Sequence, residues 1–167
     1  MPRTHDGKPR RYDQRTWPVD EAPLSGLGRE FLAYWRAKCP SGGELPARAD
    51  IMPEEILGLL PYIFMVDVLP ETREGPDYRF RLVGTAIMDL EGEHTGRLLS
   101  QMFPDRKAYA VIWAQYRDAV NKTIRVRQET LRWPDGDQTT YEVILVPLQD
   151  QSGRVSMLFG LADALAS

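Results

Sequence analysis

The segment Tyr78–Leu99 changes its backbone pattern twice within a short stretch, and this limits the folds open to the chain. From Tyr78 to Leu82, apolar residues alternate with arginines, which is the pattern of a β-strand. Gly84 then allows a sharp turn, and a short apolar helical run follows until Gly92. A strand that breaks into short helices bounded by glycines encloses space. The segment therefore favours a small sensory or ligand-binding domain over a catalytic centre.

The composition is typical of one soluble domain, and the net charge argues against two classes of partner. The chain has 167 residues, of which 43% are hydrophobic and 27% are charged, enough for a single core. A net charge of −3 gives no general attraction to nucleic acid or to an anionic membrane. The polar start of the chain has no secretory pattern, and the single cysteine, Cys39, cannot pair within the chain. We therefore expect a cytoplasmic, bacterial protein that binds neither nucleic acid nor membrane.

The N-terminal part divides into a leader and a helix. Residues 1–23 hold four prolines and many charges, which predicts a flexible leader. Residues 24–167 are expected to form one domain, with a helical cap at 24–60 and a core at 61–164. A helix is predicted over residues 24–38, begun by a Ser25 cap. Its aromatic stripe, Phe31, Tyr34 and Trp35, predicts either packing or a dimer contact.

The remaining elements predict an α+β domain with one antiparallel sheet. The last two strands carry apolar residues on both faces, so both faces of the sheet should be covered. The central helices would cover one face, and the N-terminal helix or a second subunit the other. The expected strands and the longest internal helix are, in order, Tyr62–Leu69, the strand from Tyr78, the helix Arg106–Asn121, Thr123–Arg132, Thr139–Leu148 and Arg154–Ala162.

Five short motifs, in this order, resemble the PAS domain superfamily, and in particular a bacterial group of stand-alone PAS-like proteins. They are Phe31–Arg36, Leu45–Asp50, Leu59–Pro61, Tyr78–Thr85 and Thr95–Arg97. The resemblance implies a five-stranded antiparallel sheet with helices on one face and an N-terminal helix covering the other. It also implies a pocket between the sheet and the central helices, a sensory role, and a homodimer formed through the N-terminal helix.

The resemblance does not identify a cofactor, but two candidates are disfavoured. Photoactive flavin-binding PAS domains carry a reactive cysteine near the turn that residues 93–97 occupy here, and this chain has none there. Haem-binding PAS domains usually offer a histidine from the long helix, and Arg106–Asn121 contains none. Flavin photochemistry and histidine-ligated haem are therefore not expected, and the cofactor stays unknown.

Seven residues are candidates for the pocket: Phe80, Arg81, His94, Trp113, Tyr116, Tyr141 and Phe159. His94 is interpreted as a hydrogen-bonding or pH-sensitive pocket residue, or as a turn residue facing water. Arg81 would clamp a carboxylate, or lie on a solvated strand face. The aromatic residues would line a cavity, or fill an ordinary core.

Motifs for catalysis or metal binding are missing from the sequence: there is no Cys-x-x-Cys, no pair of histidines at ligand spacing and no nucleophile elbow. We therefore predict a non-catalytic PAS-like module. It would bind a small organic ligand or a partner protein, and signal through a dimer or a downstream signalling protein. The alternative is a small hot-dog or cone enzyme acting on a hydrophobic molecule, with His94 and a nearby carboxylate as acid and base.

Overall fold

A computed structural model gives the fold, and it describes residues 7–165. Among these residues, no helix has the length and apolar character needed to cross a membrane. The elements, with η marking short 3-10 helices, are β1 (Arg10–Pro18), η1 (Val19–Glu21), α1 (Gly26–Lys38), η2 (Arg48–Asp50), η3 (Pro53–Glu55), η4 (Leu60–Tyr62), β2 (Ile63–Val68), β3 (Tyr78–Val83), α2 (Thr85–Glu91), α3 (Leu99–Met102), α4 (Ala110–Val120), β4 (Arg125–Arg132), β5 (Gln138–Gln149) and β6 (Val155–Ala164).

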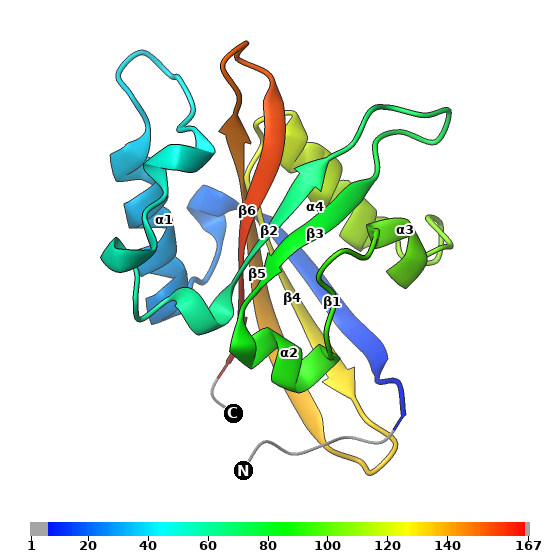
Figure 1. The fold of residues 1–167 in the computed structure, drawn as a ribbon. Helices are drawn as coiled ribbons and strands as arrows, with labels where there is room; N and C mark the ends of the chain where they lie inside the picture. The colour runs from blue at the N-terminus through cyan, green and yellow to red at the C-terminus, as the bar shows by residue number, and fades with distance from the viewer. Residues whose placement is uncertain (1–6, 166–167) are drawn as a thin grey trace.

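The strands form one antiparallel sheet in the order β1-β4-β5-β6-β2-β3 (Figure 1). The sheet has six strands, where we expected five. The additional strand, β1, lies in the segment that we expected to be a flexible leader, and it pairs with β4. A register shift between Tyr12 and Arg15 accommodates Asp13, whose φ is 54°. The expectation failed because an edge strand exposes charged side chains, and its pairing with a distant strand leaves no local signal.

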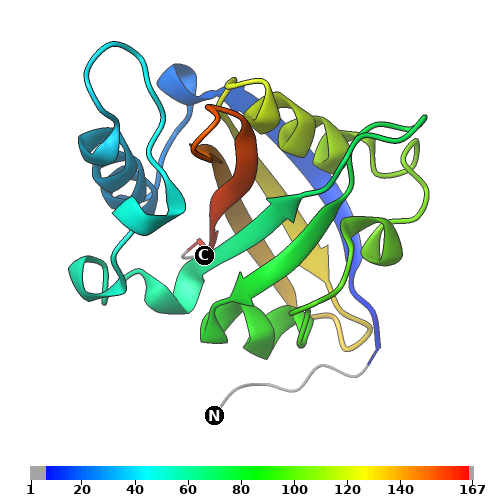
Figure 2. The ribbon, with the colours of Figure 1, turned by 45° about the horizontal axis from the view of Figure 1, so that its top comes forward.

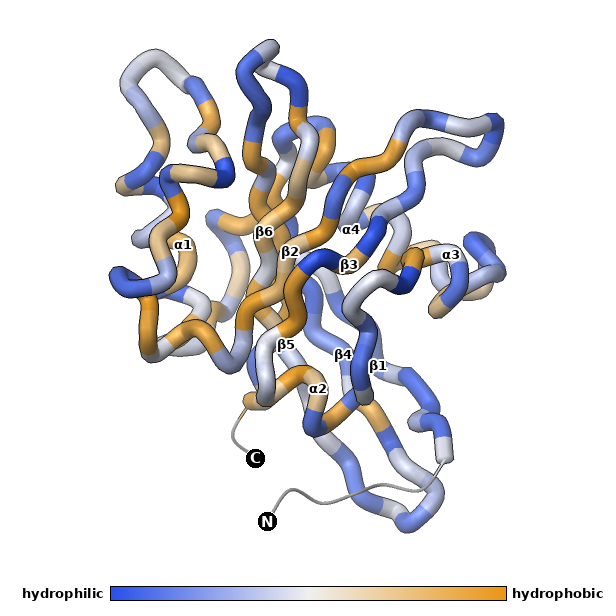
Figure 3. Tube along the Cα trace, viewed as in Figure 1, coloured by the Kyte–Doolittle hydropathy of each residue, from blue (hydrophilic) through white to orange (hydrophobic). Residues whose placement is uncertain are grey.

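Helices cover both faces of this sheet, as the apolar pattern of the last two strands predicts. Figure 2 shows α1 and the chain that follows it on one side, and α2, α3 and α4 on the other. The contacts agree, since α1 packs on β5 and β6, and α4 packs on β4, β5 and β6. The hydrophobic residues gather on the central strands, whereas β1 is mainly hydrophilic (Figure 3).

The aromatic stripe of α1 packs against the sheet of its own chain. The Phe31 ring lies 4.7 Å from the Phe159 ring, measured between centroids, and Trp35 Nε1 donates to the Pro147 carbonyl oxygen over 3.1 Å. The Tyr34 hydroxyl accepts from the Met52 amide over 2.9 Å. Phe31 and Trp35 are buried, so they are core residues and offer no surface to a second subunit.

A buried carboxylate holds the start of α1 on the sheet. Ser25 caps the helix by accepting from the Gly28 amide, and its own hydroxyl donates to Glu142 Oε2 over 2.5 Å. Glu142 is fully buried and lies opposite Asp163 on the neighbouring strand. Burial raises the pKa of Glu142, and Asp163 raises it further, although the Ser25 hydrogen bonds act in the opposite direction.

Replacing Glu142 with glutamine should therefore stabilise the protein more at high pH than at low pH. A carboxyl group whose pKa is higher in the folded state loses stability as the pH rises from its unfolded value, about 4.3, through its folded value. Glutamine removes that loss and keeps an acceptor for Ser25. Urea denaturation from pH 4 to pH 8 measures the difference, with Glu30→Gln on the exposed side of α1 as control. A difference that does not change with pH would contradict this prediction.

Candidate functional site

A cavity of about 60 Å³ lies between the sheet and the helices on its inner face. Aromatic and aliphatic side chains from β2, β3, α2, α3, α4, β5 and β6 form most of its wall. These are Phe64, Phe80, Val83, Ile87, Met102, Phe103, Ile112, Val143 and Ala162. The polar part of the wall consists of Arg11, Glu91, His94, Tyr116, Arg127 and Glu129. The cavity thus combines a large apolar surface with one concentrated polar region, as ligand pockets do.

Two arginines and two glutamates form a linked, largely buried cluster in that polar region. Arg11 Nη2 lies 2.8 Å from Glu91 Oε1, and Arg11 Nη1 bonds to Glu129. Arg127 Nη1 lies 2.5 Å from the second oxygen of Glu129, and its Nε donates to Gln115 Oε1 over 3.0 Å. The four charges cancel, which is the condition for keeping them away from water.

The cluster keeps both glutamates ionised. Burial alone would raise the pKa of Glu91, but its interactions with His94 and Arg11 outweigh burial and lower the pKa to about 2. For Glu129, burial is likewise outweighed, here by the charges of Arg127 and Arg11, and its pKa is lowered. At neutral pH, the wall of the cavity therefore contains two full negative and two full positive charges.

Several buried polar atoms at or near the cavity lack a hydrogen-bond partner within residues 7–165. They are both ring nitrogens of His94 and the hydroxyl of Tyr141, together with Nη1 of Arg127, which has its ion pair with Glu129 but no further partner. His94 is 4% exposed, and its Nε2 lies 3.5 Å from Glu91 Oε2, so the alternative that it faces water is wrong. An unsatisfied buried donor or acceptor costs about 1–3 kcal/mol. Atoms of this kind beside a cavity are available to bond a ligand.

A groove of about 520 Å³ adjoins the cavity on the solvent side. It runs between the chain before β1, the C-terminal end of α2, the turn after it, and α3. The cavity and the groove share Arg11, Glu91, His94, Met102 and Phe103. The Arg11 guanidinium lies over the Phe103 ring, 4.9 Å from its centroid. Arg11 therefore forms part of the partition between the inner cavity and the outer groove.

The structure brings three of the seven predicted pocket residues to the cavity: Phe80, His94 and Tyr116. Whether they bind a ligand stays a prediction. Tyr141 is buried and has the unpartnered hydroxyl described above, but it does not line the cavity.

The other three predicted pocket residues lie elsewhere. Arg81 is on the exposed face of β3 and pairs with Asp67, because the face that carries Phe80 is the inner one. Phe159 packs against α1, on the opposite face of the sheet. Trp113 Nε1 donates to the Phe103 carbonyl oxygen over 3.1 Å, so this side chain supports the wall from behind.

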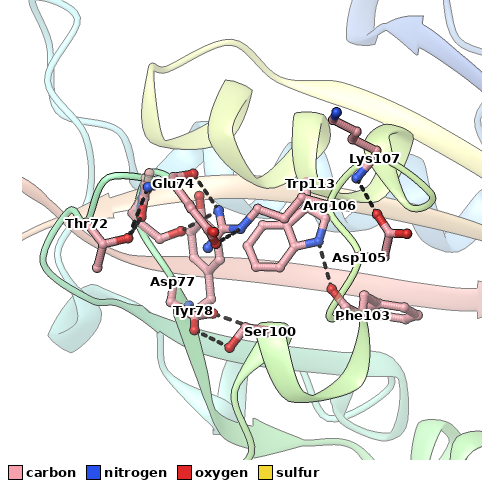
Figure 4. Close-up of polar contacts among 12 residues, drawn as sticks. Thr72, Glu74, Asp77, Tyr78, Ser100, Phe103, Asp105, Arg106, Lys107 and Trp113 are labelled. Carbon is pink, nitrogen blue, oxygen red and sulfur yellow. Dashed lines mark hydrogen bonds and ion pairs between the residues drawn. The ribbon is translucent and has the colours of Figure 1, made fainter.

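A second group of polar contacts fixes the loop between β2 and β3 to the helices (Figure 4). The Arg106 guanidinium lies 3.8 Å from the centroid of the Trp113 ring and donates to the Glu74 carbonyl oxygen over 2.9 Å. Asp77 accepts from the amide and hydroxyl of Ser100. These groups are satisfied by one another, which indicates a structural role next to the cavity.

Sequence reasoning missed the charged residues of the site: Arg11, Glu91, Arg127 and Glu129. Arg127 and Glu129 alternate with Val126 and Gln128 in the sequence, a pattern that normally indicates a strand face in water. Arg11 belongs to the segment that we expected to be mobile. Two charges at positions i and i+2 of a strand were the available signal, and they indicate burial only when their partners are known.

The sequence model of the PAS domain family matches residues 25–163. Among solved structures, the chain is similar to one described as "Structure of an RNA-binding Light-Oxygen-Voltage Receptor". The TM-score is 0.50, and the identity is 18% over 91% of this chain. The chain spans 38% of the length of that receptor, and at this identity the likeness concerns the fold alone. No curated protein matches the sequence. The family match begins after β1, so Arg11 lies outside it.

Proposed function

This chain belongs to the PAS domain family, and from that premise we propose that it binds a small organic molecule in the cavity and reports binding to a protein partner without catalysing a reaction. PAS domains are sensory or interaction modules. The observation that carries the proposal is the buried ring of His94, whose nitrogens make no hydrogen bond within residues 7–165, in the polar part of the wall of a largely apolar cavity.

Binding would be reported by the helical wall of the cavity. Glu91 ends α2 and joins it to β1 through Arg11, while Met102 ends α3 and lines the cavity. A ligand that prefers one position of this wall would shift the population toward it, by as much as its affinities for the two positions differ. The change would reach α1 through the sheet. A second copy of the chain or another signalling protein in the cytoplasm would respond to it.

The alternative enzyme interpretation has less support. It requires a hot-dog or cone fold, whereas this chain has a PAS fold. His94 and Glu91 do lie 3.5 Å apart beside the cavity. However, the pKa of Glu91 is lowered to about 2, because His94 and Arg11 outweigh the effect of burial. A general base works best when its pKa is near the operating pH, so this carboxylate is a poor proton acceptor at neutral pH.

Filling the cavity should abolish ligand-induced stabilisation. In a thermal-shift screen with a metabolite library, a ligand at a hundred times its dissociation constant stabilises the native protein by about 2.7 kcal/mol. Ala162→Leu adds carbon atoms to the cavity wall and should lose that response. Ala164→Leu is the matched control, because Ala164 lies on the same strand but is exposed. The proposal fails if no compound stabilises the wild type, or if Ala162→Leu responds as the wild type does.

A further inference from the structure

The inner cavity is small and the outer groove is larger, and Arg11 lies between them. Resting on the proposed function, we propose that together they form one site for an uncharged molecule with a short apolar body and a small amide-like head. The head would lie in the cavity beside His94 and Arg127. The body would lie in the groove, and Arg11 would close the passage between them.

The size of each compartment limits what it can hold. A cavity of 60 Å³ is smaller than the cavity of roughly 150 Å³ that accommodates benzene. It therefore admits a head of only a few heavy atoms. The groove, at about 520 Å³, has room for the rest of the molecule. Its wall is mostly polar, but Met88, Leu90 and Tyr109, with the shared Met102 and Phe103, form an apolar part, against which a short alkyl or similar body would lie.

The charges of the wall favour a neutral head. Arg11 and Arg127 are compensated by Glu91 and Glu129 through three ion pairs. A ligand carboxylate would add a negative charge that no wall residue compensates while His94 is neutral, and burying such a charge is costly. A neutral polar group has no such cost.

The unpartnered atoms specify the hydrogen bonds that the head should make. Arg127 Nη1 carries two N–H groups and never accepts; its ion pair with Glu129 uses one of them, which leaves one donor for a ligand. His94 Nε2 faces Glu91 Oε2 at 3.5 Å, whereas Nδ1 has no hydrogen-bond partner within residues 7–165, and in a neutral ring with its hydrogen on Nε2 the Nδ1 atom is an acceptor. A primary amide carries both an acceptor oxygen and N–H donors on one small planar group. It would therefore satisfy the arginine and the acceptor nitrogen of the histidine together.

Arg11 is suited to close the site because it lines both compartments. Its guanidinium is held by Glu91, by Glu129 and by the face of Phe103. It belongs to β1, which lies outside the residues matched by the family. The closing side chain is thus an addition to the matched PAS core.

Hexanamide and hexanoate test the ligand class, because they have the same shape and differ in charge. The full chain is labelled with ¹³C at its methionine methyl groups and titrated with each probe by NMR. Hexanamide should shift the Met102 signal, which reports on both compartments, and the Met88 signal, which reports on the groove. Met65 and Met157 line neither compartment and should not shift. We expect hexanamide to bind at least 10-fold more tightly than hexanoate.

A variant of His94 tests the contacts of the ligand's head separately from those of its body. His94→Phe keeps a planar ring and removes both ring nitrogens, so hexanamide should bind at least threefold more weakly while Met88 still shifts. Tighter binding of hexanoate, shifts confined to Met88, or an unchanged affinity of His94→Phe for hexanamide would each overturn the inference. If neither probe binds but a library compound still stabilises the wild type, this ligand class is wrong and the proposed function stands. If no compound binds at all, both fail.

Discussion

Replacing Arg11 with methionine should lower the free energy of unfolding by about 3–5 kcal/mol at neutral pH, the usual cost of removing one partner from a buried ion pair. Methionine keeps much of the apolar stem and removes the guanidinium that bonds Glu91 and Glu129. Glu129 retains Arg127, but Glu91 is left with His94 as its nearest partner. Urea denaturation followed by tryptophan fluorescence measures the loss.

Arg15→Met is the matched control for this experiment. Arg15 is on the same strand, its side chain is 65% exposed, and it pairs with the exposed Asp13. Exposed pairs of this kind contribute about 0–1 kcal/mol, so the control should change stability little. Equal effects of Arg11→Met and Arg15→Met would mean that Arg11 does not hold the charged cluster together. They would support the first interpretation of residues 1–23 as a mobile leader.

The cost of Arg11→Met should also depend on pH in a defined direction. Burial opposes ionisation of Glu91, but His94 and Arg11 lower its folded pKa to about 2, well below the unfolded value of about 4.3. A depressed carboxyl pKa stabilises the folded state above the unfolded pKa, and this contribution is lost as the pH falls toward the folded pKa. The difference between wild type and Arg11→Met should therefore be largest near pH 7 and smaller at pH 3.5. A larger difference at pH 3.5 would contradict the assignment.

Local sequence patterns were sufficient for the elements that carry their own signal. The stripe Phe31, Tyr34 and Trp35 predicted α1, and the structure confirms both the helix and its Ser25 cap. The strand around Phe80 alternates and the strand around Tyr141 carries apolar residues on both faces, and both lie where they were expected. These signals are local because each depends on the period of one helix or strand.

Interactions between distant segments could not be predicted in this way. The strand that carries Arg11 is stabilised by pairing with β4, more than a hundred residues later. The inward position of Arg127 and Glu129 makes physical sense only with Arg11 and Glu91 beside them. Four of the six polar residues in the cavity wall therefore depend on long-range partners. Phe80 and Tyr116, which follow from the period of one strand and one helix, were predictable.

At Gly84, too, a local interpretation of the sequence missed a contact with a distant segment. The sequence suggested that this glycine supplies a sharp turn through its backbone freedom. Its φ is −65°, however, an ordinary value for any residue. The constraint is space, because a Cβ at this position would lie 2.3 Å from the Pro61 carbonyl oxygen and 2.6 Å from that of Leu60. The backbone is held this close by a 2.8 Å hydrogen bond from the Gly84 amide to the Ile63 carbonyl oxygen.

Gly84→Ala should consequently destabilise the protein by about 3 kcal/mol, the upper end of the usual cost of overpacking, since the obstructing atoms are backbone and cannot rotate away. Gly58→Ala is the control, because a Cβ there meets no atom within 4 Å. Because Gly84 precedes α2, which contributes Ile87 and Glu91 to the cavity, any shift that relieves the clash moves the wall proposed to report binding. Urea denaturation and ligand titration of the same variant should therefore change together. A Gly84→Ala variant with wild-type stability and wild-type binding would show that this wall is not fixed by its approach to Pro61.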